Sequence, residues 1–172
     1  AQNLYDMIDR IRSRVPNIAL RTTFLVGFPG ESEKAFMEIE KFLRKTRIDH
    51  VGIFSYANEE GSPSEKFAKQ VSLKERNRRR DYLLAVQAGI SKEIQNSYIG
   101  RTEPVLVEGV CSETDLLLQG RTRYQAPEVD GCVLINEGTA CPGDIVPVHI
   151  TDAQVYDLVG GIVASDEKIN CR

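Results

Sequence analysis

Residues 20–31 read Leu-Arg-Thr-Thr-Phe-Leu-Val-Gly-Phe-Pro-Gly-Glu, and this stretch decides how the first half of the chain folds. With the two residues before it, its first seven residues make a nearly continuous run of strand formers, which is typical of a buried parallel strand. The Gly-Phe-Pro-Gly that follows is typical of a tight turn. The sequence therefore predicts a strand over residues 18–26 that ends in a turn.

A helix and a second strand follow this turn. The helix opens at Glu31 or Ser32, and residues 50–56 again read as a strand. A strand–helix–strand unit of this length makes a parallel pair, but two strands neither close a sheet nor cover their own helices. The chain also begins at Ala1 rather than at an initiating methionine, with no preamble to its first predicted helix, residues 3–14. We interpret it as a fragment whose further strands lie upstream.

The second half of the sequence has a different pattern of predicted elements. Ser72-Leu-Lys-Glu is a capping box that starts a helix running to about Ser97. Four arginines between residues 76 and 80 lie on this helix, and we interpret them as a solvated face. After Gly100, short β-forming segments alternate with turn residues, which predicts a small closed or nearly closed barrel of the OB type. The expected strands are residues 103–111, 116–122, 130–136, 144–151 and 155–163.

The fold class predicted is α/β plus all-β, with one domain over residues 1–97 and a second over residues 98–165. The hydrophobic share is 41% and the charged share is 27%, so a packed core is expected rather than disorder. No apolar run is long enough to span a membrane and no leader precedes the first helix. We therefore expect a cytoplasmic protein with no membrane partner.

Charge differs between the two halves. Residues 1–99 hold 17 Lys and Arg against 13 Asp and Glu, whereas residues 100–165 hold 3 against 10. An RNA-binding barrel needs a basic groove and stacking aromatic rings, but Tyr124 and Tyr156 are the only aromatic residues between 100 and 165. We therefore expect a basic protein partner for the barrel, and no RNA.

Candidate catalytic side chains are scarce. The four cysteines at positions 111, 132, 141 and 171 lack the spacing of a zinc or iron–sulfur site, and we expect buried or incidental thiols. His50 and His149 lie far apart with no partner pattern. Because no Ser–His–Asp or Cys–His arrangement is present, we expect no catalytic residue and no metal ligand in this chain.

Residues 20–31, the Val-Gly-Ile-Phe-Ser-Tyr of residues 51–56 and the Glu-Gly-Ser-Pro of residues 60–63 resemble the fifth and sixth strands of a radical-SAM barrel, in its methylthiotransferase branch. That family carries a loose Gly-x-Ile-x-Gly-x-x-Glu pattern beside the adenine of S-adenosylmethionine. Leu25 and Gly27 match its middle, Thr23 replaces the first glycine and Glu31 sits one place late. The resemblance implies these cofactor-binding residues: Arg21, Thr23, Leu25, Gly27, Phe28, Phe54 and Tyr56. Arg21 has two interpretations, a contact to the cofactor carboxylate or the substrate, or a salt bridge to a carboxylate of a missing strand.

The β-rich half resembles a TRAM domain. Residues 120–131, Gly-Arg-Thr-Arg-Tyr-Gln-Ala-Pro-Glu-Val-Asp-Gly, are similar to those of the RimO-type enzymes, which modify a small-subunit ribosomal protein. The Gly-Asp-Ile-Val of residues 143–146 and the Tyr-Asp-Leu-Val-Gly of residues 156–160 also fit. On this resemblance, the substrate-binding residues expected are Arg121, Arg123, Glu128 and Asp130.

RimO-type enzymes use S-adenosylmethionine and two 4Fe–4S clusters. One cluster cleaves the cofactor to a deoxyadenosyl radical, which takes a hydrogen from the β-carbon of an aspartate in small-subunit ribosomal protein twelve, and a methylthio group is installed there. The cluster cysteines of the family are absent from this sequence. The resemblance thus implies an inactive part of such an enzyme, with no tightly bound cofactor, that supplies some of the barrel wall beside S-adenosylmethionine and the substrate-recruiting domain. Its partners are the basic ribosomal protein and the missing N-terminal part of its own chain.

Two alternatives remain open. The first is a fragment of the sister enzyme, the tRNA-adenosine methylthiotransferase, and the string over residues 120–131 and the charge of the barrel argue against it. The second is a non-catalytic binding module, in which the α/β half is a scaffold. Two strands with uncovered faces should leave an apolar patch and cause association, so a well-behaved monomer would favour the binding module.

Overall fold

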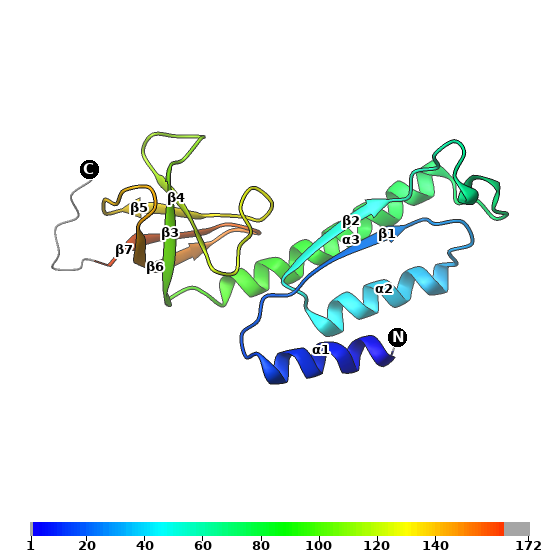
Figure 1. The fold of residues 1–172 in the computed structure, drawn as a ribbon, viewed down its shortest axis with the longest axis horizontal. Helices are drawn as coiled ribbons and strands as arrows, with labels where there is room; N and C mark the ends of the chain where they lie inside the picture. Colours follow the sequence, from blue (N-terminus) through cyan, green and yellow to red (C-terminus); the bar gives the residue numbers. More distant parts are fainter. Residues whose placement is uncertain (1, 164–172) are drawn as a thin grey trace. The chain divides into compact units, whose positions relative to one another are not determined.

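The computed structural model describes residues 2–163, and the chain divides into two compact units, Ala1–Ile90 and Ser91–Arg172. The first unit is an α/β segment and the second contains a closed five-stranded barrel, which confirms the predicted order of an α/β part and a small β-barrel (Figure 1). Helix α3 (Leu73–Asn96) contributes residues to both units. Among the described residues no helix is long and apolar enough to cross a membrane.

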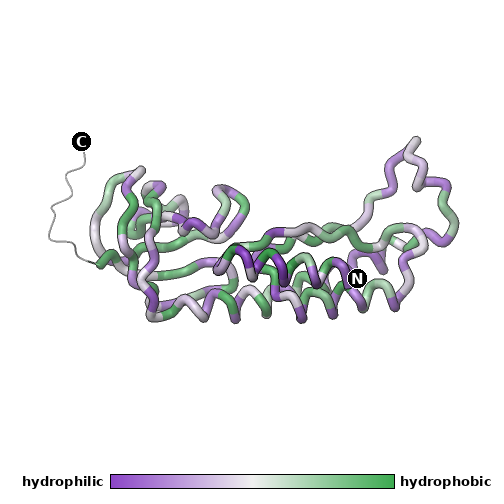
Figure 2. The backbone as a smooth tube through the Cα atoms, turned by 60° about the horizontal axis from the view of Figure 1, so that its bottom comes forward, coloured by the Kyte–Doolittle hydropathy of each residue, from purple (hydrophilic) through white to green (hydrophobic). Residues whose placement is uncertain are grey.

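The first unit is built on two parallel strands, β1 (Arg21–Val26) and β2 (His50–Ser55), joined by α2 (Glu33–Thr46). Helices α1 (Gln2–Arg14), α2 and α3 lie on one side of this pair, and apolar residues run along both strands (Figures 1 and 2). The face of the sheet toward the helices carries Val26 and Ile53, which are buried. Strand side chains alternate between faces, so the opposite face of the pair has no helix over it within the described part of this unit.

The helices of the first unit form as the sequence predicts. Ser32 is the N-cap of α2, where its hydroxyl accepts a hydrogen bond from the Ala35 amide at 3.2 Å. Helix α1 is held against α2 by the Tyr5 and Phe42 rings, whose centroids are 5.2 Å apart. The Arg12 guanidinium donates to the Thr46 carbonyl at the end of α2. The core of the unit comprises Ile8, Val26, Phe36, Leu43, Ile48, Ile53, Leu83, Val86 and Ile90.

The second unit is a closed barrel with strand order β3-β4-β5-β7-β6. Its strands are β3 (Thr102–Val110), β4 (Leu118–Thr122), β5 (Val133–Glu137), β6 (Ile145–Ala153) and β7 (Leu158–Ile162), each close to a predicted segment. Strand β3 pairs with β6 as well as with β4, so every strand of the barrel has two neighbours. A continuous core fills the interior: Val105, Val107, Val133, Ile135, Ala140, Val146, Val148, Ile150, Ala153 and Leu158.

The cysteines differ in state. Cys111 and Cys132 are free, whereas Cys141 is disulfide-bonded, so the expectation of incidental thiols throughout is wrong at Cys141. Burial, with the nearby Asp157 carboxylate, raises the pKa of the Cys132 thiol to about 12. Cys132 is therefore an inert neutral thiol at ordinary pH.

Candidate functional site

The uncovered face of the β1–β2 pair is the first candidate surface. We call it the open sheet face; it consists of Arg21, Thr23 and Leu25 of β1 and His50, Gly52 and Phe54 of β2, which are cross-strand neighbours in that order. Leu25 is 51% exposed and Phe54 is 59% exposed. Exposed apolar side chains on adjacent strands are typical of an interaction surface, which makes this face a candidate site.

Gly52 shapes the middle of the open sheet face. A Cβ built on Gly52 would lie 3.2 Å from Cε2 of Phe54 and 3.5 Å from Oγ1 of Thr23. The Phe54 ring thus lies over the space that a larger side chain at position 52 would occupy. An aromatic edge and a hydroxyl are side by side as a result.

The C-terminal ends of the two strands carry a cluster of aromatic rings. The Phe28 ring packs edge-on against the rings of Tyr56 and Phe67, with centroids 5.2 Å and 6.1 Å away. The Tyr56 hydroxyl lies 2.8 Å from Oγ of Ser64, in the short helix η1 (Pro63–Lys66). The loop after β2 is therefore folded over the strand ends, where ligands of parallel α/β folds bind.

Arg76 of α3 clamps both strand ends. Its Nη1 donates to the Tyr56 carbonyl at 2.7 Å, and its Nε donates to the Val71 carbonyl at 2.9 Å. Its aliphatic stem covers Gly27, where an added Cβ would lie 2.2 Å from Cγ of Arg76. Gly27 also has a φ of 79°, which favours glycine. Two independent reasons thus require a glycine at this position.

A buried ion pair supports the same turn. Nη1 of Arg79 lies 2.5 Å from Oε1 of Glu31, and both side chains are at most 10% exposed. The same carboxylate oxygen accepts the Gly27 amide at 3.1 Å. Nε of Arg79 reaches Glu75 at 2.8 Å, and hydrogen bonds from Arg78 and Arg79 lower the pKa of Glu75 to about 2.

The prediction that the four arginines of α3 form a solvated face is wrong for Arg76 and Arg79. Arg79 is 6% exposed, and Arg76 is half-buried against the turn. Arg78 and Arg80 remain on the surface and pair with nearby carboxylates. The i,i+4 spacing of Glu75 and Arg79 was visible in the sequence, but their long-range partner Glu31 was not.

The predicted cofactor-binding residues fall into two groups. Arg21, Thr23, Leu25 and Phe54 share the open sheet face, whereas Gly27, Phe28 and Tyr56 lie at the strand ends. Arg21 begins β1 and Gly27 follows its end, so about 20 Å of extended chain separates them. The structure brings together the members of each group, and it places Arg21 farthest from the strand ends.

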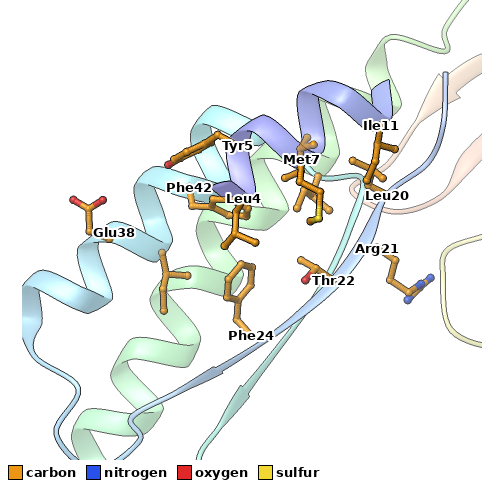
Figure 3. Close-up of a pocket in the computed structure, with 13 residues that line it drawn as sticks. Leu4, Tyr5, Met7, Ile11, Leu20, Arg21, Thr22, Phe24, Glu38 and Phe42 are labelled. Carbon is orange, nitrogen blue, oxygen red and sulfur yellow. The ribbon is translucent and has the colours of Figure 1, made fainter. Parts of the chain in front are cut away.

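A separate apolar pocket of about 360 Å³ lies between α1, β1 and α2. Figure 3 shows Leu4, Met7 and Phe24 around it, with the Arg21 guanidinium directed away from these side chains. Its lining is almost wholly apolar, so it offers few groups that could orient a polar ligand.

The predicted substrate-binding residues of the barrel have different neighbours. Arg121 pairs with Glu108 at 2.7 Å. Arg123 stacks on the Tyr124 ring, with Cζ 4.7 Å from the ring centroid, and also bonds to its hydroxyl. Glu128 is exposed, with a φ of 61°.

Asp130 is engaged in its own loop. Its Oδ2 accepts the Ala126 amide at 2.7 Å. Gln125 accepts the Thr122 amide at 2.9 Å, and a Cβ on Gly131 would lie 2.1 Å from the Tyr156 carbonyl oxygen. Much of the distinctive string over residues 120–131 therefore builds the loop, and Arg123 and Glu128 are its exposed charges.

No group of three or more His, Cys, Asp or Glu side chains that could hold a metal occurs among residues 2–163.

Comparison with known proteins bears on both units. A family model described as TRAM domain matches residues 99–163, which contain the barrel. A protein named ribosomal protein uS12 methylthiotransferase RimO, from Desulfotalea psychrophila, is 56% identical over 162 residues, covering 94% of this chain and 37% of that protein.

Proteins of the same name from two other bacteria are also similar. That of Anaeromyxobacter sp. (strain K) is 49% identical over 95% of this chain and 35% of its own length. That of Bdellovibrio bacteriovorus is 46% identical over 91% of this chain and 34% of its own length. The chain thus spans about a third of the length of these relatives, and the similarity extends through the α/β unit as well as the barrel.

Proposed function

From the premise that this chain is homologous to the C-terminal region of RimO, TRAM domain included, we propose that it is part of a radical-SAM methylthiotransferase. Its substrate in this proposal is ribosomal protein uS12, which the names of its relatives specify for them. A methylthio group is added to the β-carbon of an aspartate of that protein, in the cytoplasm. Residues 1–97 serve the cofactor and residues 98–165 serve the substrate.

The open sheet face is the observation that carries this proposal. Two parallel strands with helices on one side and exposed Leu25 and Phe54 on the other are what the last two strands of a parallel barrel look like when viewed alone. In the proposal, this face lines the inside of a radical-SAM barrel, and strands from the N-terminal part of the protein complete the sheet along β1.

The open sheet face and the turn after β1 together suit S-adenosylmethionine. Leu25 and the Phe54 ring offer apolar surface for a purine, and the Thr23 hydroxyl beside the ring offers a hydrogen bond. The glycine turn lets the backbone approach the cofactor closely. Arg21, at the far end of β1, suits the second of its two interpretations, an ion pair with a carboxylate from an upstream strand.

When bound, S-adenosylmethionine and two 4Fe–4S clusters supply the radical chemistry and the sulfur. The residues of this chain bind and orient the cofactor and exclude water from one side of it. Cluster ligands are proposed to come from the N-terminal part of the protein.

The barrel recruits the substrate in this proposal. Its 10 acidic residues against 3 arginines give it a field that attracts a basic ribosomal protein and repels RNA. Arg123 and Glu128 are the exposed members of the predicted substrate-binding set. Asp130 contributes through the shape of the loop.

A binding titration tests this proposal. The chain is titrated at about 150 mM salt, and again at higher salt, with uS12, with an unrelated basic protein of matched size and charge, and with unmodified tRNA. We expect salt-sensitive binding of uS12, at least about tenfold tighter than that of the basic control. Glu128→Gln should weaken binding of uS12, and Glu113→Gln, which removes another exposed barrel carboxylate, should not.

Equal affinity for uS12 and the basic control would reduce the barrel to a general acidic surface and would contradict substrate recruitment. Binding of tRNA alone would replace the proposal with the tRNA-adenosine methylthiotransferase. Binding of none of these molecules, in a stable monomer, would favour the non-catalytic module.

A further inference from the structure

Two separate connections run from α3 to the turn that follows β1. The first is Arg76, whose stem covers Gly27 and whose guanidinium holds the Tyr56 carbonyl. The second is Arg79, which holds the Glu31 carboxylate that in turn accepts the Gly27 amide. Gly27 is therefore held from its amide side and from its α-carbon side by the same helix.

The ion pair between Arg79 and Glu31 is buried, so losing either partner would change the conformation of the turn. The side chains of Arg79 and Glu31 are 7% and 10% exposed, and an unpaired charge at that depth is costly. Arg79 also donates to the Glu31 carbonyl at 3.1 Å, so it holds the backbone as well as the carboxylate. Without Arg79, the Glu31 side chain would turn toward water and release the Gly27 amide.

Neither arginine belongs to the open sheet face. Arg76 contacts the carbonyl of Tyr56 and the backbone of Gly27, and Arg79 contacts carboxylates and a carbonyl. Any effect of Arg79 on a ligand at that face must therefore pass through the turn, and any effect of Arg76 must pass through the turn or through Tyr56 at the end of β2. Such residues are positioning residues.

We propose that Arg76 and the Glu31–Arg79 pair hold the turn over residues 27–30 in the conformation that S-adenosylmethionine binding requires, so that the first two turns of α3 set the affinity for the cofactor. This inference rests on the proposed function for the identity of the ligand. The fixed turn itself rests on the contacts alone. A turn fixed before binding spares the cost of ordering it when the cofactor arrives.

The first measurement is hydrogen exchange of the Gly27 amide in this chain, without cofactor. Arg76→Met keeps an apolar stem over Gly27 and removes the guanidinium, and Arg79→Met removes the partner of Glu31. Arg80→Met is the matched control, because Arg80 is on the same helix and its carboxylate partner is Asp81. We expect exchange of the Gly27 amide to become at least about tenfold faster in Arg79→Met, and to change little in Arg80→Met.

The second measurement is the equilibrium Kd for S-adenosylmethionine in the complete protein, reconstituted without oxygen. Arg76→Met and Arg79→Met should raise this Kd about tenfold, with the Kd for uS12 unchanged, since uS12 is recruited by the barrel. A residue with a merely structural role would lower both affinities together. If Arg79→Met does not fold, Glu31→Gln weakens the same pair from its other side and is measured in its place.

Wild-type exchange and cofactor affinity in folded Arg76→Met and Arg79→Met would overturn the inference. A wild-type protein that binds no S-adenosylmethionine would instead overturn the proposed function, while the exchange measurement would still decide whether α3 holds the turn.

Discussion

The barrel and the two-stranded sheet differ in how far their strands are paired. Among the residues that the structure describes, the barrel leaves no strand edge unpaired, whereas the sheet leaves an unpaired edge on each of its two strands. In the barrel each strand pairs on both sides, and ten buried residues fill the interior. In the α/β unit β1 and β2 pair only with each other among the described strands, and one face holds exposed Leu25 and Phe54. The difference teaches that the barrel is complete by itself, whereas the sheet has the form of a part to be completed.

The contrast between the barrel core and the open sheet face predicts that shortening a side chain costs much more stability in the barrel core. Ile150 is fully buried in the barrel, so Ile150→Ala should lower the free energy of unfolding by about 2–5 kcal/mol. Leu25→Ala, on the open sheet face, should cost less than about 0.5 kcal/mol. Urea unfolding, followed separately for each unit, measures both. A large loss for Leu25→Ala would mean that the open face is covered within the chain.

A smaller effect concerns association. Exposed apolar side chains on adjacent strands should make the chain self-associate through the open sheet face. Phe54→Ser should weaken that association about ten- to a hundredfold, since burying a phenylalanine contributes about 1.5–3 kcal/mol. Sedimentation equilibrium measures it.

The matched control is Leu116→Ser, in a barrel loop, where the wild-type side chain is 88% exposed. Its substitution should leave association unchanged. If Leu116→Ser were the variant that dissolved the oligomer, association would belong to the barrel.

The smallest expected effect is a difference in acid stability between the start of α3 and the barrel. The pKa of Glu75 falls from 4.5 to about 2 because Arg78 and Arg79 donate hydrogen bonds to it. A lowered folded-state pKa stabilises the fold above pH 4.5, and this contribution is lost as the pH falls from 4.5 toward 2. Acid unfolding should therefore loosen the start of α3 before the barrel, as circular dichroism and amide exchange would record.

Glu75→Gln should remove the part of this acid sensitivity that comes from position 75, and Glu113→Gln should not. An acid transition identical in wild type and Glu75→Gln would show that the bonds from Arg78 and Arg79 do not contribute.

Local patterns predicted most of the elements. Strand formers over residues 18–26 and 50–56 contain β1 and β2, and α2 begins directly after Ser32, one of the two residues at which the sequence predicted its start. The five barrel strands lie within a few residues of their predicted segments. Such features depend on neighbours close in sequence, which is why a single sequence carries them.

The candidate site was only partly predictable. The sequence predicted a buried parallel strand over residues 18–26, whereas Leu25 of β1 is 51% exposed within the described residues. That the described helices all lie on one side of β1 and β2 is a fact of the packing. The string over residues 120–131 marked the TRAM domain, yet the sequence did not distinguish Asp130, which holds its loop, from the exposed Glu128.

By itself, the sequence determined the elements, their order and the family resemblance, because periodicity, turn residues and motifs are local properties of the chain. The tertiary structure alone decided which of four neighbouring arginines are solvated. Arg79 can be buried because the carboxylate of Glu31, 48 residues earlier, lies 2.5 Å from its guanidinium, Oε1 to Nη1. Arg78 lies on the outward side of α3 and is exposed. The physical reason is that the energy of a charge depends on what surrounds it, and only the folded chain supplies those surroundings.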